Sequence, residues 1–511
     1  MQTLLMHPGD NVAQAIVDLP ASQMVTVDGD AIALRQAIPS GHKLARRPIG
    51  RGELVLKYGQ PIGRAATEIA TGEHVHVHNV ESLRGRGDLV VASPVIARSV
   101  LCDEAIPNME EIASAHTTGL AMTPRESVFL GYRRRDGRVG VRNHVLVLAS
   151  VQCANAVVDA IGRAVPEVVA LSHAWGCSQI GDDLAQSRRV LEEFASHPNV
   201  AAALLIGLGC ESMPTVAMAE ALAGRGVAIR RLTIQEESGS RATIGRGIAL
   251  ARELLAEAAQ AQREPIPLSE LIVGLECGGS DAWSGVTANP AVGVASDLLV
   301  QAGGTAILSE VPEFIGAEHL LAGRAASPEV GRQIVAATLA HEAAAMRMGV
   351  DLRGAQPTPG NIAGVLTTIE EKSLGAITKG GSGAVQEFLP YAHRPTRRGL
   401  VVMDTPGNDT ESVTGMVAGG AQVIVFTTGR GAPTGCPIAP VIKVATNSVM
   451  FRRLAGDMDL DAGTIIEAGE PLADVGTRIF GEIVAVANGK EMAAERLGAR
   501  EFAINVIGPL L

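Results

Sequence analysis

The chain has 511 residues, 47% of them hydrophobic but only 3% aromatic, with 58 glycines and a formal net charge of -11. Two or three domains are expected at this length, because one hydrophobic core rarely organises more than about 250–300 residues. The acidic balance argues against nucleic acid as the main partner, since no continuous basic surface would neutralise phosphates. Small aliphatic residues with many glycines are typical of α/β layers joined by tight turns.

The N-terminal segment 1–16 lacks the basic start, apolar run and small-residue cleavage site of a secretory signal. No later apolar stretch is long enough to cross a bilayer. The 6 cysteines lie far apart, which does not resemble a disulfide framework, so free thiols or metal ligands are expected. These features predict a cytoplasmic protein without a membrane partner.

The first part of the chain shows short β-type alternations at 24–36, 53–66 and 73–80, separated by glycine and proline turns. They predict a small β-rich domain over residues 1–82. The pattern loses its period over 83–128, which we interpret as a linker arm.

From residue 129 onward, strand-like and helix-like segments alternate, a pattern typical of parallel strands with crossover helices. A central α/β domain, 129–265, is predicted with strands at 144–150, 167–175 and 201–209 and helices at 154–165, 184–196 and 216–224. A C-terminal domain, 266–511, is predicted to be Rossmann-like with a mostly parallel sheet, from strand candidates at 271–277, 306–311, 399–405, 422–428 and 465–469 and helix candidates at 290–303 and 329–347. Ligands bind beyond the carboxyl ends of strands in such sheets, so polar motifs there are the first candidates for a site.

Three histidines, His74, His76 and His78, recur at every second residue, which in a strand places all of them on one face. Two or three imidazoles could bind one metal ion or contact a substrate, and a structural role is the alternative. His42, in a turn of the same domain, is suited to proton transfer near neutral pH, whereas the alternative is a solvated turn histidine.

Four cysteines, Cys153, Cys177, Cys210 and Cys277, lie at the ends of strand-like runs beside glycine or small polar residues. Their thiolates could converge on an iron ion or an iron–sulfur cluster, because soft sulfur ligands favour such metals. The spacings match no zinc ribbon and no CxxC pattern. The alternative is that these cysteines fill small gaps in the core.

A glycine-rich turn follows Cys277 and precedes a predicted helix, where backbone N–H groups and hydroxyls can hold a carboxylate or phosphate. Its candidate substrate-binding residues are Gly278, Gly279, Ser280, Asp281 and, further on, Asn289. Such turns also occur for steric reasons alone. No P-loop sequence and no convincing dinucleotide fingerprint is present, which argues against ATP or NAD as a ligand.

Three later turns, 357–361, 405–409 and 427–431, combine turn formers with polar side chains and are interpreted as the rim of one site. Arg430 offers a planar fork for a carboxylate. Asn408 and Asp409, the latter together with Glu310, could contact hydroxyls or supply hard oxygen ligands. Surface turns of this composition without a function are the alternative.

Several long motifs, in this order along the chain, resemble the altronate/galactarate dehydratase family: 131–143, 173–179, 207–211, 276–281 and 287–290. The N-terminal domain is similar to the β-clip (SAF-type) domain of that family, including segments 10–13, 41–43 and 57–59 and the three histidines. The resemblance covers nearly the whole chain. It implies an α/β protein with a small N-terminal β-clip (SAF-like) domain followed by two α/β domains.

The resemblance also implies an Fe(II)-dependent homodimer, with Mn(II) as a substitute, that removes water from a 2,3-dihydroxy acid to give a 2-keto-3-deoxy acid. An iron–sulfur cluster remains open as the form of the iron. Such a reaction needs a cation to stabilise the enediolate-like state, a base for the C2 proton and an acid for the C3 hydroxyl. The candidates are His42 with its neighbour Lys43 for proton transfer, His74 and His76 for metal or acid–base roles, and Arg430 with Gly278 for the carboxylate.

The histidine set and the turn 406–409 resemble the altronate branch of the family, so D-altronate is the first expected substrate, with 2-keto-3-deoxy-D-gluconate as product. Cys436 departs from the residues that relatives commonly carry after the 429–431 turn and could reshape the substrate rim. The alternatives are a galactarate dehydratase, an enzyme resembling sulfolactate sulfo-lyase, or a non-catalytic sugar-acid-binding protein, since a fold by itself does not establish chemistry.

Overall fold

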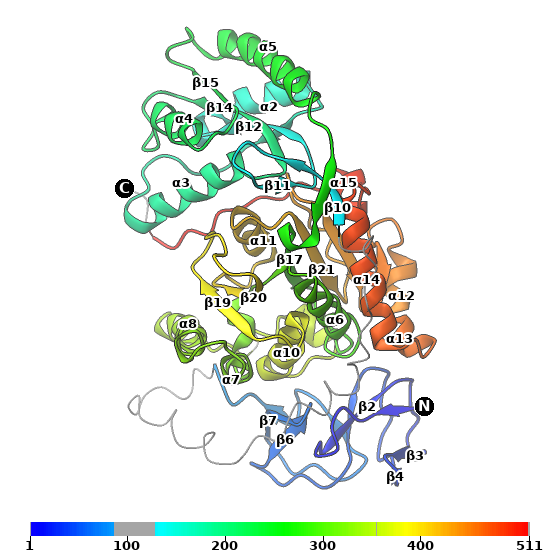
Figure 1. Ribbon diagram of the computed structural model, residues 1–511. Helices are drawn as coiled ribbons and strands as arrows, with labels where there is room; N and C mark the ends of the chain where they lie inside the picture. Colours follow the sequence, from blue (N-terminus) through cyan, green and yellow to red (C-terminus); the bar gives the residue numbers. More distant parts are fainter. Residues whose placement is uncertain (1, 86–127, 354, 509–511) are drawn as a thin grey trace.

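A computed structural model describes residues 2–85, 128–353 and 355–508 of the chain. The linker arm predicted for 83–128 falls almost entirely outside these described residues. Figure 1 shows the small N-terminal β domain and the central α/β domain on opposite sides of the C-terminal α/β domain.

The N-terminal part consists of short antiparallel strands in three small sheets. Their order is β1 (Thr3–Leu4), β2 (Val12–Ala15), β5 (Lys43–Ala45) and β8 (His74–Val75) in the first, β3 (Met24–Val27) and β4 (Asp30–Ala33) in the second, and β6 (Leu54–Lys57), β7 (Gln60–Ala65) and β9 (Val80–Glu81) in the third. The alternation at 73–80 was expected to form one strand, but β8 ends at Val75. His76 and His78 lie in the following turn, because the Asn79 side chain accepts a hydrogen bond from the His76 N–H and closes it.

The central part holds a parallel sheet in the order β13 (Val169–Leu171), β12 (His144–Ala149), β14 (Val200–Gly207) and β15 (Ile229–Thr233). Its helices are α2 (Asn155–Ala164), α3 (Gly181–Ala195), α4 (Thr215–Gly224) and α5 (Ser240–Ala258). Each predicted strand and helix of this part is present, but the strand expected at 167–175 is shorter and ends at Leu171. A small antiparallel sheet of β10 (Val128–Arg133), β11 (Val139–Gly140) and β16 (Glu264–Pro267) leads into and out of it.

The C-terminal part is built on a seven-stranded parallel sheet, which confirms the predicted fold class. The strand order is β19 (Val385–Leu389), β20 (Gly399–Met403), β18 (Thr305–Leu308), β17 (Ile272–Gly278), β21 (Val423–Thr428), β22 (Val441–Ala445) and β23 (Leu460–Asp461). The strand predicted at 465–469 is wrong, since this segment forms the short helix α13 (Thr464–Glu467). A brief apolar run does not by itself distinguish a strand from a helix.

Helices cover both faces of this sheet, which explains why β17 is buried along its length. On one face α6 (Ala288–Gln301) packs against α14 (Leu472–Ala487) over a core that includes Val273 and Val425. On the other face α11 (Asp409–Ala418) packs against α3 of the central part, over a core that includes Met416 and Phe426. One continuous core therefore fixes the central part against the C-terminal sheet.

The remaining helices lie in two places. Beside the N-terminal β domain are α7 (Glu318–Gly323), α8 (Pro328–Arg347), α9 (Pro359–Ala363) and α10 (Ile369–Ala376), of which α10 contacts β7. The helices α12 (Ser448–Arg453) and α15 (Ala493–Leu497) contact β22 of the C-terminal sheet instead. Within the described part of the chain, no helix combines the length and the apolar character needed to cross a membrane.

Candidate active site

A cavity of about 180 Å³ lies at the carboxyl end of β17, where ligands bind in sheets of this kind. Several segments meet at this cavity, among them the turn after β17, the segment before α9, α10, the start of α11 and the turn after β21. The side chains and turns that line the cavity are Cys277, Gly278, Gly279, Glu313, Gln356, Thr358, Gly360, Asn361, Lys372, Gly407, Asp409 and Arg430. The structure thus brings together Gly278, Gly279, Asp409 and Arg430 from the residues predicted to bind substrate.

Glycine is required at the turn after β17 because the Asp409 side chain lies directly on it. A Cβ atom at residue 278 would stand 2.2 Å from the Asp409 Oδ2 atom and 2.7 Å from the Phe426 ring. Gly279 has a φ of +59°, a conformation that favours glycine. The sequence Gly278-Gly279 therefore lets a carboxyl group and the backbone share the floor of the cavity.

Beneath this floor, Cys277 belongs to a buried ionic network. The Lys379 ammonium lies 2.6 Å from the Cys277 sulfur and 3.0 Å from Glu310, and the Cys277 sulfur lies 3.3 Å from Glu313. Lys372 forms an ion pair of 2.6 Å with Glu313. Burial, reinforced by Glu313, holds the pKa of the Cys277 thiol well above its ordinary value. Burial acts to raise the pKa of Glu313, but Lys372 and Lys379 lower it by more, so the pKa is below its ordinary value. This carboxylate is therefore charged at neutral pH.

A second group of acids lies beside the first, because Glu276, Glu310 and Asp409 each place a carboxylate oxygen within 4.8 Å of the others. Burial and the charges of Glu310 and Glu313 raise the pKa of Asp409 to about 7. Burial lowers the pKa of Lys443 to about 7, and its ammonium lies 3.5 Å from the centre of the Phe426 ring.

These groups titrate near neutrality, as acid–base catalysts do. Among the described residues, one oxygen each of Glu276 and Glu310 and the Lys443 ammonium have no hydrogen-bond partner. Such unpaired buried groups are costly unless they have a functional partner.

The predicted histidines form a second cluster, in the N-terminal domain. His42 Nδ1 lies 2.7 Å from His74 Nε2, and the His76 ring centre is 5.1 Å from that of His42. The exposed His78 ring lies 5.2 Å from His74. Pairing of β5 with β8, with Leu44 opposite His74, brings the turn that carries His42 beside the histidine segment.

Burial is the main cause that lowers the pKa of His74 to about 4 and of His76 to about 3, and neighbouring cations and imidazoles add to it. At pH 7 both rings are therefore neutral, which is the form that binds a metal. Clustered imidazole nitrogens are a donor set that suits iron. The carboxylates of Glu276, Glu310 and Asp409 are a second, oxygen-based donor set.

The histidine cluster is close to the loop that forms the cavity floor. His76 Nδ1 lies 3.3 Å from the Thr367 hydroxyl, just ahead of α10. A Cβ atom at Gly41 would touch Ala282 and Trp283, and the Gln14 side chain donates to the Ala282 carbonyl at 3.1 Å. The loop between β17 and α6 thus lines the cavity at its start and touches the turn before His42 further on.

Lys43, a predicted catalytic residue, is fully buried and lies 2.9 Å from Glu371 of α10. Lys57 reaches the same carboxylate, also at 2.9 Å. Burial acts to raise the pKa of Glu371, but the two ammonium groups hold it far below its ordinary value. Burial together with the excess positive charge of Lys57 lowers the pKa of Lys43 to about 8, although Glu371 opposes the shift. These contacts hold the Lys43 side chain at the boundary between the β domain and α10.

Four of the predicted substrate-binding residues do not line this cavity, and their polar groups have partners within the protein. Asp281 accepts hydrogen bonds from Ser284, Thr446 and Asn447. Asn289 accepts from Thr427 and donates to the Gly375 carbonyl, Asn408 caps α11, and the Ser280 carbonyl accepts from Asn361. Their polar groups are used to hold the loops around the cavity in place.

The expectation that the four cysteines converge is wrong for Cys277, which is buried in the C-terminal sheet between Lys379 and Glu313. Cys153, Cys177 and Cys210 are exposed free thiols at the carboxyl edge of the central sheet. Cys436 is buried as well.

Sequence reasoning missed several charged groups of the cavity and its floor, namely Glu276, Glu313, Lys372, Lys379 and Lys443. A usable signal existed for two of them. Glu276 and Lys443 each interrupt an otherwise apolar strand, and a charge in such a position must be paired or functional.

The three parts of the chain each match a known family. Residues 1–83 match the altronate/galactarate dehydratase SAF domain, 131–259 the second domain of D-galactarate dehydratase/altronate hydrolase, and 268–509 the C-terminal domain of D-galactarate/altronate dehydratase.

Full-length relatives agree with these matches. The chain is 34% identical to altronate dehydratase of Bacillus subtilis (strain 168), over 98% of this chain and 97% of the relative. It is 36% identical to altronate dehydratase of Escherichia coli (strain K12), over 99% of each. It is also 36% identical to galactarate dehydratase (L-threo-forming) of the same strain, over 95% of this chain and 92% of the relative. The chain therefore belongs to the altronate/galactarate dehydratase family and is a hydro-lyase.

Proposed function

We propose that the chain removes water from D-altronate to give 2-keto-3-deoxy-D-gluconate, with Fe(II) bound and Mn(II) able to replace it. The observation that carries the proposal is the cavity at the end of β17, where Arg430, the Gly278-Gly279 turn and an acid with a pKa of about 7 meet. Near-complete coverage of two altronate dehydratases supports this choice of substrate.

The residues around the cavity would have two tasks, binding the substrate carboxylate and exchanging a proton. The Arg430 guanidinium and the backbone N–H groups of the glycine turn bind the carboxylate, since both present donors in a fixed geometry. Asp409 titrates near neutrality because it is buried beside Glu310, so it can take up or release a proton at the cavity. Lys443 also titrates near neutrality and helps to balance the charge of that acid group.

The neutral imidazoles of His74 and His76, with His78 at the rim of the cluster, are the residues that would hold Fe(II). When bound, the ion supplies a positive charge that stabilises an enediolate-like state. His42, hydrogen-bonded to His74, positions that ring and can exchange a proton with it. We also propose that the chain functions as a homodimer.

The test is anaerobic turnover of D-altronate by the purified chain, with galactarate and sulfolactate as comparison substrates, with and without added Fe(II). Iron-dependent appearance of a 2-keto-3-deoxy acid from altronate is the expected result. Galactarate is the second candidate, because the identity to a galactarate dehydratase is equally high. Faster turnover of galactarate or sulfolactate would overturn the substrate assignment, and no turnover by iron-loaded protein would favour a binding role.

A further inference from the structure

The central domain carries three exposed free thiols at one edge of its sheet, away from the cavity of the C-terminal sheet. Cys153, Cys177 and Cys210 follow β12, β13 and β14, three strands that are neighbours in the sheet. Free cysteine is among the most frequently buried residue types. Filling of core gaps can account for the buried Cys277 and Cys436, but it does not account for the three exposed thiols.

The loops that carry these thiols are tied to one another by hydrogen bonds next to the cysteines. The Gln152 N–H donates to the Trp175 carbonyl at 2.8 Å, which joins the loop after β12 to the loop after β13. The Ser212 N–H donates to the Gly176 carbonyl at 3.1 Å, which joins the loop after β14 to the loop after β13. Each cysteine is therefore within two residues of a bond that connects two of the three loops.

Close contact between the first two loops depends on glycine. Gly176, directly before Cys177, has a φ of +108°, and a Cβ atom there would stand 2.3 Å from the Ser150 carbonyl oxygen and 2.6 Å from the Val151 Cα. The Ser150 hydroxyl in turn donates to Glu211, next to Cys210, at 3.1 Å. The chain therefore brings the three cysteine-bearing segments together at one place.

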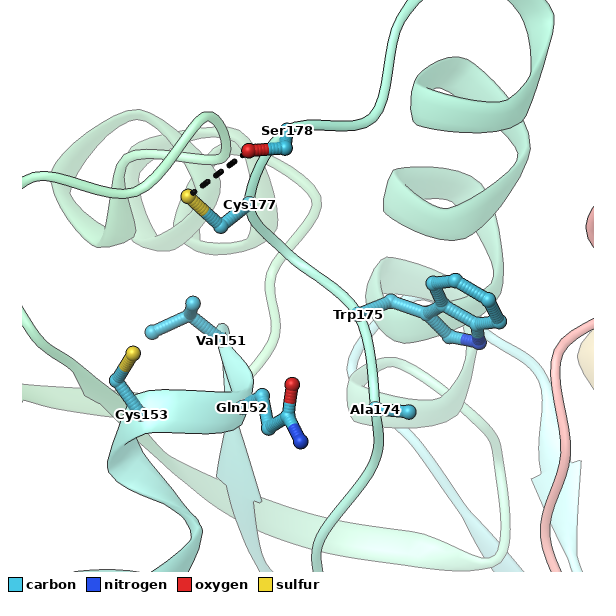
Figure 2. A pocket seen from close by; sticks show the side chains of 7 residues that line it. All are labelled: Val151, Gln152, Cys153, Ala174, Trp175, Cys177 and Ser178. Atoms are coloured by element: carbon cyan, nitrogen blue, oxygen red, sulfur yellow. Dashed lines mark hydrogen bonds between the residues drawn. The ribbon is translucent and has the colours of Figure 1, made fainter. Parts of the chain in front are cut away.

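A cavity of about 300 Å³ lies between the first two of these segments, so that Cys153 and Cys177 line it and Cys210 does not. It is lined by Val151, Gln152, Cys153, Ala174, Trp175, Cys177 and Ser178, and Figure 2 shows Cys153 and Cys177 on two segments that face each other across it. The helices α2, α3 and α4 begin shortly after the three cysteines. Their N-terminal ends carry partial positive charge, which stabilises nearby thiolates.

We propose that Cys153, Cys177 and Cys210 bind an iron–sulfur cluster through three thiolates, leaving one iron without a protein ligand. Thiolates select zinc, copper(I) or iron–sulfur clusters. A structural zinc site is closed by four ligands, whereas these three thiols are exposed. The open iron faces the cavity, where a hydroxyl or carboxylate oxygen can reach it.

The experiment is anaerobic reconstitution of the full chain with iron and sulfide, followed by iron and sulfide analysis, absorbance near 400 nm and electron paramagnetic resonance after reduction. We expect about four iron and four sulfide ions per chain, the content of a [4Fe–4S] cluster. Cys153→Ala, Cys177→Ala and Cys210→Ala should each remove most of the sulfide and the absorbance band. These readouts do not depend on turnover, so they remain valid if the proposed substrate is wrong.

Two variants serve as matched controls. Ser178→Ala changes a residue that lines the same cavity without removing a thiol, and Cys436→Ala removes a buried thiol elsewhere. Both should retain the cluster. Thermal unfolding of each variant before reconstitution separates loss of a ligand from loss of the fold. Iron uptake without sulfide, binding of zinc in its place, or a cluster retained by the three cysteine variants would overturn the proposal.

Discussion

The carboxyl group of Asp409 lies against the backbone of Gly278, so closely that a Cβ atom at residue 278 would stand 2.2 Å from Oδ2. This contact joins the carboxyl end of β17 to the start of α11 at the floor of the cavity. It also explains why both residues belong to one functional unit although 131 positions separate them in the chain.

Gly278→Ala should lower kcat/KM for the sugar acid by about 100-fold or more, because the added methyl group displaces Asp409 and a misplacement of about 1 Å is that costly. Steady-state kinetics measure the loss. Gly481→Ala is the matched control, since a Cβ atom at this exposed position in α14 meets nothing within 4 Å. It should leave activity unchanged and stabilise the helix by about 0.5–1 kcal/mol. Equal activity of the two variants would contradict the assigned floor of the cavity.

Asp409→Asn should abolish most activity. It should also raise the stability of the chain above that of the parent, and this gain should be larger at pH 8 than at pH 5. The pKa of Asp409 is raised to about 7 in the folded state, mainly by burial. Folding therefore favours the protonated carboxyl, and stability is lost as the pH rises from the unfolded pKa toward 7. The neutral amide does not have this cost. Thermal unfolding of both chains at the two pH values tests the sign, and a smaller advantage at pH 8 would show that the carboxyl is stabilised in its charged form.

Glu371→Gln should destabilise the chain by about 3–5 kcal/mol, because it leaves two buried ammonium groups without a counter-charge. Lys43→Met should cost much less, since Lys57 remains paired with Glu371. Denaturant unfolding at pH 7 gives both values. The pKa of Glu371 is depressed in the folded state, so its contribution is present above the unfolded pKa and is lost as the pH falls through the folded pKa. If Lys43→Met lowered the free energy of unfolding more than Glu371→Gln, the two ammonium groups would not be an excess of positive charge around the one carboxylate of Glu371.

His74→Ala should reduce the Fe(II) bound by the purified chain at least 10-fold, because it removes the ring that contacts both His42 and His78. Metal analysis after anaerobic dialysis measures the loss, on protein that has not been reconstituted with sulfide. His319→Ala removes an exposed imidazole outside the cluster and should leave the iron content unchanged. An unchanged iron content of His74→Ala would contradict a histidine site and would favour the carboxylates of Glu276, Glu310 and Asp409 as the iron ligands.

Hydrophobic patterning was enough to predict the parallel sheets. The strands at 144–149 and 272–278 and the helices at 155–164 and 288–301 were expected within a few residues of their observed bounds. Patterning was wrong at 465–469, where the end of helix α13 (Thr464–Glu467) and the turn after it replace the expected strand. It also failed to identify β19 and β22, which carry the polar residues Gln386, Glu387 and Lys443.

Candidate residues were predictable where a turn follows a strand, because the carboxyl ends of parallel strands meet at one edge. This reasoning located Gly278 and Arg430 at the cavity. It could not separate Asp409, which lines the cavity, from Asp281, which is held by Thr446 and Asn447. The difference lies in the partners of each carboxylate, and those partners come from distant parts of the chain.

The sequence by itself determined the family, the layered α/β architecture and the types of residue available for chemistry, because these depend on local periodicity and on motifs of adjacent residues. Only the tertiary structure decided which of these residues meet. Pairing of β5 with β8 brings His42 into contact with His74, and packing of α11 on the sheet raises the pKa of Asp409. Backbone hydrogen bonds join the three strand-end loops that carry Cys153, Cys177 and Cys210. Burial and long-range contact, which set both pKa values and ligand geometry, arise only when distant segments of the chain pack together.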